Sequence, residues 1–224
     1  MSACGTRLSP MPARALRPLS VVVVLVLSGC SGTLVEFTAS PATIPESALG
    51  PQGYVHGNTT AVPITYRVGA PGFSQDVTAE TWLSGYSKTT ADNETAVLLV
   101  YSSPDVTVEG TSVNPLRQLS NRELVTFVLD RASGLRGLGG VEDVTDLQEV
   151  GARNVTVLGA STQLVSYAGR AEVDGQSVAV VVNVAVVSHD GDVVVALGVH
   201  EERLDERAAH AALVERMVHI GADA

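Results

Sequence analysis

Cys30 is the residue whose chemistry the sequence predicts most directly. It ends the stretch Leu27-Ser28-Gly29-Cys30, which has the order of a lipobox: an apolar residue, two small residues and a cysteine. In such a motif the small residues admit a signal peptidase, and the thiol takes a lipid before the cysteine becomes the mature N-terminus. We therefore predict lipidation at Cys30. The alternative is an ordinary signal cleaved near Gly29, with an incidental cysteine.

The segment before Cys30 is typical of a signal peptide. The apolar run Val21 to Leu27 covers only ~10 Å as a helix, against a hydrocarbon core ~30 Å thick, so it is too short to span a membrane. Arg7, Arg14 and Arg17 supply the positive charge that precedes such a run. Without an Arg-Arg pair the export route stays open, and translation could begin at Met1 or Met11.

These features predict three parts of the chain. Residues 1–29 form a lipoprotein signal peptide, 30–32 a short tether, and 33–224 a single acidic globular domain. The membrane, reached through the lipid on Cys30, is then the first partner, and the location is the extracellular face of the cell membrane. Cys4 and Cys30 are the only cysteines, so no disulfide or cysteine-based metal site is expected.

No catalytic residue can be nominated. The G-x-S-x-G turn of serine hydrolases is absent, and Ser84 and Ser161 lie in strand-like sequence as ordinary strand hydroxyls. The glycine-rich stretch GLRGLGG, residues 134–140, lacks the Lys-Ser/Thr pair of a phosphate-binding loop and is interpreted as a connection. We expect no cofactor and no enzymatic activity; an enzyme with an unrecognised site is the alternative.

The histidines do not predict a metal site. Asp192 and His200 lie at opposite ends of one expected strand, about 26 Å apart, which is too far for one ion. Turn chemistry explains the Asp-Gly pair after His189, and His210 is interpreted as a satisfied residue at the edge of the core. His56 and His219 have no evident partner in the sequence.

Three sequons could carry glycans on an exported chain, at Asn58, Asn93 and Asn154. Asn58 and Asn93 lie in polar, loop-like surroundings, whereas Asn154 enters an expected strand. An asparagine that happens to precede a threonine in a Thr-rich sequence is the alternative at each position.

The composition indicates an acidic surface. The chain carries 24 acidic against 14 basic residues, a net charge of −10, and Lys88 is its only lysine. Such a surface repels itself in dilute buffer, and molar salt screens that repulsion. We hypothesise a salt-loving host, with an acidic protein of a GC-rich mesophile as the rival. Nucleic acid is not expected as a partner, because no basic patch is present.

The hydropathy pattern predicts an α+β fold. Expected strands cover 33–38, 61–68, 73–87, 97–101, 154–158, 161–173, 177–188 and 193–200, with tight hairpins at Asp174-Gly175 and Asp190-Gly191. Expected helices begin near Pro45, at the capping box Ser120 to Glu123, and at Leu204, the last running to Ile220. Because strands follow one another in hairpins, we predict one antiparallel sheet with the C-terminal helix packed on it, or an α/β/α sandwich.

Five sequence blocks together resemble a family: PATIPESALGPQGY, ETWLSGYSK, NPLRQLSNRELV, NVTVLG and HDGDVVVALGVHEERLDE. The chain is similar to haloarchaeal lipoproteins of unknown function, over nearly all of the segment after Cys30. That resemblance implies a location and a domain extent but no activity, so Cys30 is the only functional residue it carries over. The ending also resembles PsbP-like sandwiches at the level of fold alone.

Our leading interpretation is a non-enzymatic, lipid-anchored module that binds an envelope protein. A small-ligand binding protein that assists a membrane transporter is the alternative. Solute-binding proteins use aromatic stacking, and this chain offers Trp82 with only a few tyrosines and phenylalanines.

Overall fold

A computed structural model describes residues 36–70, 73–108, 110–133, 142–173 and 176–220 of the chain. The predicted signal peptide, Cys30 and the loop 134–140 lie outside these residues. The described residues belong to one compact unit, Val35–Ala224.

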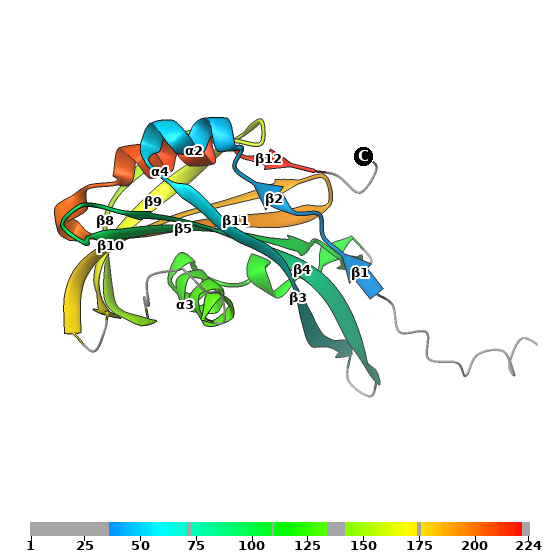
Figure 1. The fold of residues 1–224 in the computed structure, drawn as a ribbon. Helices are drawn as coiled ribbons and strands as arrows, with labels where there is room; N and C mark the ends of the chain where they lie inside the picture. The colour runs from blue at the N-terminus through cyan, green and yellow to red at the C-terminus, as the bar shows by residue number, and fades with distance from the viewer. Residues whose placement is uncertain (1–35, 71–72, 109, 134–141, 174–175, 221–224) are drawn as a thin grey trace, which may run out of the picture. The chain divides into compact units, whose positions relative to one another are not determined.

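The fold is built on an eight-stranded sheet (Figure 1). The strand order is β1-β4-β5-β11-β10-β9-β8, and β3 pairs with the outer side of β4. The bounds of these strands are β1 Glu36–Thr38, β3 Val55–Ala70, β4 Phe73–Thr89, β5 Thr95–Pro104, β8 Glu142–Val157, β9 Ala160–Val173, β10 Gln176–His189 and β11 Asp192–Glu201.

The sheet is mixed, which corrects the prediction of a purely antiparallel one. β1 runs parallel to β4, with Glu36 opposite Thr78 and Thr38 opposite Glu80. β5 pairs only with the later part of β4, from Trp82 onward. β1 pairs with the earlier part of β4, along the same edge of that strand. All other pairs in this sheet are antiparallel hairpins or neighbours, as the sequence predicts.

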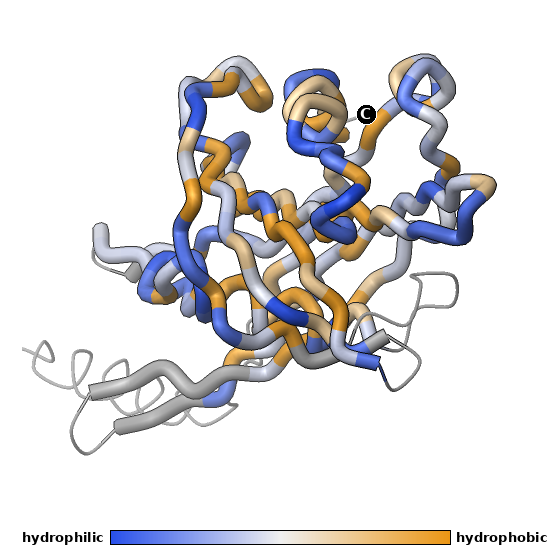
Figure 2. The backbone as a smooth tube through the Cα atoms, turned by 90° about the vertical axis from the view of Figure 1, so that its left-hand side faces the viewer, coloured by the Kyte–Doolittle hydropathy of each residue, from blue (hydrophilic) through white to orange (hydrophobic). Residues whose placement is uncertain are grey.

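Three helices cover the sheet. α2 (Glu46–Gln52) and α4 (Arg207–Val214) lie on one face, and α3 (Asn121–Ala132) lies on the other (Figure 1). Each face has its own apolar cluster, one containing Leu213 and Val214, the other Leu124 and Val128. Figure 2 shows apolar residues running along the central strands between these layers.

The strand β10 explains how two cores can share one sheet. Its sequence SVAVVVNVAVVSH barely alternates, which predicts a strand covered on both faces. The structure confirms this, because Val182 and Val184 belong to the core under α3 while Ala185 and Val187 belong to the core under α2 and α4.

Short elements complete the fold. β2 (Ala42–Thr43) pairs with β12 (Val218–His219), and β6 (Thr107–Val108) pairs with β7 (Thr111–Ser112). The 3-10 turns are η1 (Pro115–Arg117) and η2 (Glu202–Leu204). Strand hydroxyls hold the chain that crosses the sheet toward α2: Ser84 Oγ donates to the carbonyl of Ala42, and Tyr86 Oη accepts from the amide of Ile44. Ser84 is thus a strand hydroxyl with a structural role, as expected.

The last helix is shorter than predicted. It ends at Val214 instead of Ile220, and Val218 and His219 are extended so that they pair with β2. Met217 is still buried, which is why the apolar spacing continued past the end of the helix. The first helix, α2, is longer than predicted: it continues past Gly50 to Gln52, and Gly53 ends it with φ 75°.

The first half of β8 was missed. Residues 142–153 are mostly polar and lie at the sheet edge, where the register shifts three times and Asp146 takes φ 56°. An exposed, irregular edge strand shows no clean alternation, so the pattern predicted only its last residues.

Candidate functional site

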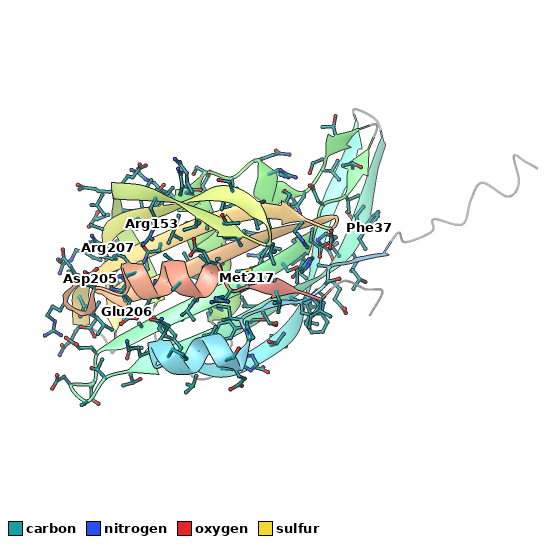
Figure 3. The ribbon with its side chains drawn as sticks, turned by 90° about the horizontal axis from the view of Figure 1, so that it is seen from above. Phe37, Arg153, Asp205, Glu206, Arg207 and Met217 are labelled. Carbon is teal, nitrogen blue, oxygen red and sulfur yellow. The ribbon has the colours of Figure 1, made fainter. Side chains whose placement is uncertain are left out.

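A groove lies between α2 and α4 on the face that the two helices share. Figure 3 looks down on this face and shows the helices side by side over the strands, with Glu206 at one end of α4 and Met217 beyond the other. The groove encloses about 500 Å³. This volume falls in the range of about 300–1,000 Å³ typical of small-molecule sites. Its walls include Pro45 before α2, Ala48 and Pro51 of α2, Ala212 of α4, and Arg216 and Val218 after α4.

Hydrogen bonds beneath the groove hold the two helices together. Tyr54, directly after α2, lies with its Oη 2.8 Å from Nε2 of His210 on α4. Both side chains are buried, and their rings meet edge to face at 5.9 Å. A buried contact therefore joins the end of α2 to α4, in addition to the surfaces of the two helices.

The chain of hydrogen bonds continues into the sheet. Nδ1 of His210 lies 3.0 Å from Nδ2 of Asn183 on β10, and the Oδ1 of Asn183 accepts a hydrogen bond from Ser166 Oγ on β9. An amide nitrogen only donates, so Nδ1 of His210 is the acceptor and its Nε2 carries the proton donated to Tyr54. In this direction each of the three links from Ser166 to Tyr54 has one donor and one acceptor.

Gly198 makes room for the imidazole. A Cβ at this position on β11 would lie 2.2 Å from Nδ1 of His210. The ring therefore packs directly on the backbone of the strand, and any side chain at 198 would displace it.

A charge pair anchors the start of α4. Nζ of Lys88 on β4 lies 2.6 Å from Oε1 of Glu206, the residue before α4, and both groups are largely buried. The second oxygen of Glu206 and Nε2 of His200 are also buried and have no hydrogen-bond partner among the residues that the structure describes. Nδ1 of His200 donates to the carbonyl of Glu201, so its Nε2 is an acceptor.

Burial keeps the side chains of His210, His200 and Tyr54 neutral. It lowers the pKa of His210 to about 3, with His200 and Lys88 adding to the effect. Burial likewise lowers the pKa of His200, and burial together with the negative charge of Glu206 raises the pKa of the Tyr54 hydroxyl. At neutral pH, Tyr54 and His210 therefore act as fixed hydrogen-bonding groups that position the groove walls.

Only part of this network is predictable from the sequence. His210 was expected at the edge of the core, but it is fully buried, because Asn183 and Tyr54 satisfy both of its nitrogens. Asn183 was the available signal, since it is the only amide inside a run of valines and alanines. Tyr54 and Glu206 gave no comparable signal.

A second cluster forms at the tip of the β10–β11 hairpin. Nδ1 of His189 lies 3.1 Å from Nδ1 of His219, and Nε2 of His219 lies 3.0 Å from Oδ2 of Asp192. His219 thus has partners, contrary to the expectation from the sequence, and so does His56, which contacts Thr59 Oγ1. His189 and His200 lie at opposite ends of the hairpin, as predicted.

The three sequon asparagines are all exposed. Asn58 lies on the outer strand β3, Asn93 in the turn before β5 with φ 61°, and Asn154 on the edge strand β8. The expectation that Asn154 enters a strand is correct, and its edge position leaves the side chain at the surface. Glycosylation at these positions stays a prediction, as does lipidation at Cys30.

The fold and site define a small mixed-sheet domain with a pre-formed groove on one helical face. The chain belongs to the family described as Domain of unknown function (DUF6517), whose family model matches residues 41–218. No curated protein matches the chain. Within the described residues no helix is long and apolar enough to cross a membrane.

Proposed function

We propose that this protein is a non-enzymatic binding module held at the extracellular face of the cell membrane by a lipid on Cys30. The order of charge, short apolar run, small residues and cysteine supports the anchor. The predicted tether, residues 30–32, is short. At ~3.3 Å per extended residue it reaches ~10 Å, so we propose that the domain works close to the membrane surface.

The observation that carries the binding function is the α2–α4 groove. The Tyr54–His210 hydrogen bond joins the end of α2 to α4, and the Lys88–Glu206 pair fixes the start of α4 to β4, which supports a surface that is pre-organised for a partner. Pre-organisation lowers the entropy cost of binding. Proline and alanine side chains offer apolar contact along α2, while Arg216 offers a positive charge at the opposite wall. An envelope protein segment with apolar side chains and one acidic group fits this surface.

Site-specific photo-crosslinking tests the groove on intact cells. A photoreactive residue at Ala48, in the groove wall, should capture an envelope protein. The same residue at Thr126, exposed on α3 on the opposite face, is the matched control and should capture none. Equal capture from both positions, or none from Ala48, would contradict the proposal.

Membrane anchoring is tested separately. Intact mass should match a chain that begins at Cys30 and carries lipid, and a Cys30→Ser variant should leave the membrane fraction. An unmodified chain cut elsewhere would remove the anchor and the short tether from the proposal while leaving the groove to be judged by crosslinking.

A small-ligand binding protein that assists a transporter is the second candidate, and the groove volume favours it. In that case a small molecule should survive gentle purification and be released on denaturation. Replacement of Arg216 by serine should reduce its retention, whereas the same change at Arg122, exposed on α3, should not.

We also propose a salt-loving, archaeal host. The acidic composition and the single lysine support this origin. The three sequons, whose asparagines are exposed, are proposed as glycan acceptors on the same surface-located chain. A glycan mass at any of them, lost on an Asn→Gln change, is the expected result.

A further inference from the structure

Two histidines from distant parts of the chain point the same type of nitrogen at each other. His189 is the last residue of β10, and His219 belongs to β12 near the C-terminus. Their Nδ1 atoms lie 3.1 Å apart, and Oδ2 of Asp190 lies 3.4 Å from Nδ1 of His189. The three ligand atoms all lie within 4.8 Å of one another.

The protonation of His219 follows from its other nitrogen. Nε2 of His219 lies 3.1 Å from the backbone carbonyl oxygen of Ser40 and 3.0 Å from Oδ2 of Asp192. A carbonyl oxygen only accepts, so Nε2 carries the proton. In the neutral ring Nδ1 then presents its lone pair toward His189, whose Nδ1 carries the proton of this hydrogen bond. Binding of an ion would displace that proton, leaving His189 protonated on Nε2 or releasing the proton to solvent.

Asp192 is itself held in place. Its Oδ2 accepts a hydrogen bond of 2.7 Å from the backbone amide of Ser40, and its side chain is 6% exposed. A buried carboxylate that accepts from the far nitrogen of a histidine is the usual second partner of metal-binding imidazoles, because it orients the ring and makes the near nitrogen more basic.

The distances suit a tetrahedral ion. Zinc binds imidazole nitrogen and carboxylate oxygen at about 2.0–2.2 Å, which places two ligands of a tetrahedral ion about 3.3 Å apart. The observed separations of 3.1 Å and 3.4 Å bracket this value. The third pair, Nδ1 of His219 and the carboxylate of Asp190, lies within 4.8 Å, and the exposed side chain of Asp190 would move inward to complete the site.

We propose that Nδ1 of His189, Nδ1 of His219 and a carboxylate oxygen of Asp190 bind one divalent transition-metal ion of the zinc type. Asp192 is the positioning residue that orients His219. Two imidazoles and one carboxylate favour zinc, cobalt, nickel or copper over calcium or magnesium, which prefer ligand sets made only of oxygen. Asp192 and His200, whose separation along the hairpin speaks against a shared ion, are not the ligands of this site, and His219 reaches the hairpin tip only through the tertiary fold.

The site is open on one side and closed on the other. The side chain of His219 is fully buried, that of His189 is 28% exposed and that of Asp190 is 68% exposed. An ion can therefore enter from solvent past Asp190, and a water molecule would supply a fourth ligand. Because β12 pairs with β2, the ion would join the hairpin tip to both of these segments.

Titration of the full chain with Zn²⁺ and Co²⁺ tests the proposal, using protein purified without a histidine tag. We expect one ion per chain, tetrahedral Co²⁺ absorption bands and a higher melting temperature with Zn²⁺. No binding, or binding without a defined stoichiometry, would overturn the proposal.

Ligand variants locate the ion. His189→Gln and Asp190→Asn change exposed or half-exposed positions, so both should fold, and each should weaken Zn²⁺ binding at least tenfold. Asp192→Asn should weaken it by about 10–100-fold while leaving one ion per chain, as expected for a positioning residue. Melting of each variant in a chelator shows whether the metal-free fold is intact.

His56→Gln is the matched control, because His56 is exposed on β3 and contacts Thr59 instead of the hairpin tip. Unchanged Zn²⁺ affinity is expected. An equal loss in His56→Gln and His189→Gln would show nonspecific histidine binding and contradict the site. The crosslinking test of the α2–α4 groove is independent of these measurements.

Discussion

His210 shows how a polar side chain is accommodated at a fully buried position of this domain. Asn183 donates to one nitrogen and Tyr54 accepts from the other, so the ring is satisfied without a charge. A buried polar group without such partners would cost several kcal/mol. The cost of this arrangement is strict geometry, because the ring lies directly on the backbone of Gly198.

Gly198→Ala should therefore destabilise the domain strongly. The new Cβ would lie 2.2 Å from Nδ1 of His210, and neither the strand nor the ring can move without breaking hydrogen bonds. Overpacking of this kind costs about 1–3 kcal/mol or more. Denaturant unfolding measures the change in free energy. Gly151→Ala is the control, since nothing lies within 4 Å of a Cβ at that edge position; equal losses in both variants would contradict the argument.

The same histidine predicts a pH dependence of stability. Its folded pKa is lowered to about 3, below the unfolded value of about 6.5, so on acidification the unfolded chain takes the proton first. The contribution of His210 is complete above about pH 6.5 and is lost as the pH falls toward 3. At pH 5.5 the expected loss is about 1.4 kcal/mol relative to pH 7.5.

Unfolding in chelator at pH 7.5 and 5.5 measures this loss, in a range where ordinary carboxyl groups stay ionised. His200 acts in the same direction, because burial lowers its pKa as well. A His210→Gln variant should lose a large part of the pH dependence. Stability that is flat or rises on acidification would show that His210 is not the buried neutral group described above.

At the scale of elements, the position of α4 depends on contacts at its two ends. At its start, Glu206, the residue before α4, pairs with Lys88 on β4. Beyond its end, Met217 packs in the core and β12 pairs with β2. The helix itself has only eight residues. Helices this short are marginal alone, so tertiary contacts determine where α4 lies.

Lys88→Met should consequently destabilise the domain by about 2 kcal/mol, since it leaves the carboxylate of Glu206 buried without its cation. The double variant Lys88→Met with Glu206→Gln should recover part of that loss. Arg117→Met is the control, because its pair with Asp105 is more exposed and exposed pairs contribute about 0–1 kcal/mol. Thermal melting of the unmodified protein and the three variants measures these losses. Equal losses in Lys88→Met and Arg117→Met would contradict the role given to the buried Lys88–Glu206 pair.

At the scale of the whole molecule, charge sets the conditions under which the domain should fold. The net charge is −10, and Lys88 is the only lysine. In molar salt the Debye length is about 3 Å, so repulsion between surface carboxylates is screened, whereas at low salt it destabilises the compact state.

Circular dichroism during desalting tests this prediction. The folded signal should persist in molar salt and decline toward 50 mM. A fold that is unchanged at 50 mM would remove the salt-loving host from the proposal, and the acidic composition would then need no special environment.

Local features were predictable from the sequence because their partners lie close along the chain. The capping box joins Ser120 to Glu123, three residues apart, and it starts α3 as expected. Asp190 and Gly191 take φ 46° and 82°, which the two-residue hairpin requires. Hairpin order and the doubly covered strand β10 follow from the same short-range patterns.

The tertiary structure alone decided which distant residues meet. Tyr54 and His210 are 156 positions apart, His189 and His219 are 30 apart, and β1 joins β4 in parallel through contacts some 40 positions apart. One sequence holds no periodic signal for such pairings, because each depends on how the chain closes over the sheet. Composition and local spacing therefore determined the element types, while the groove and the histidine cluster arose from packing.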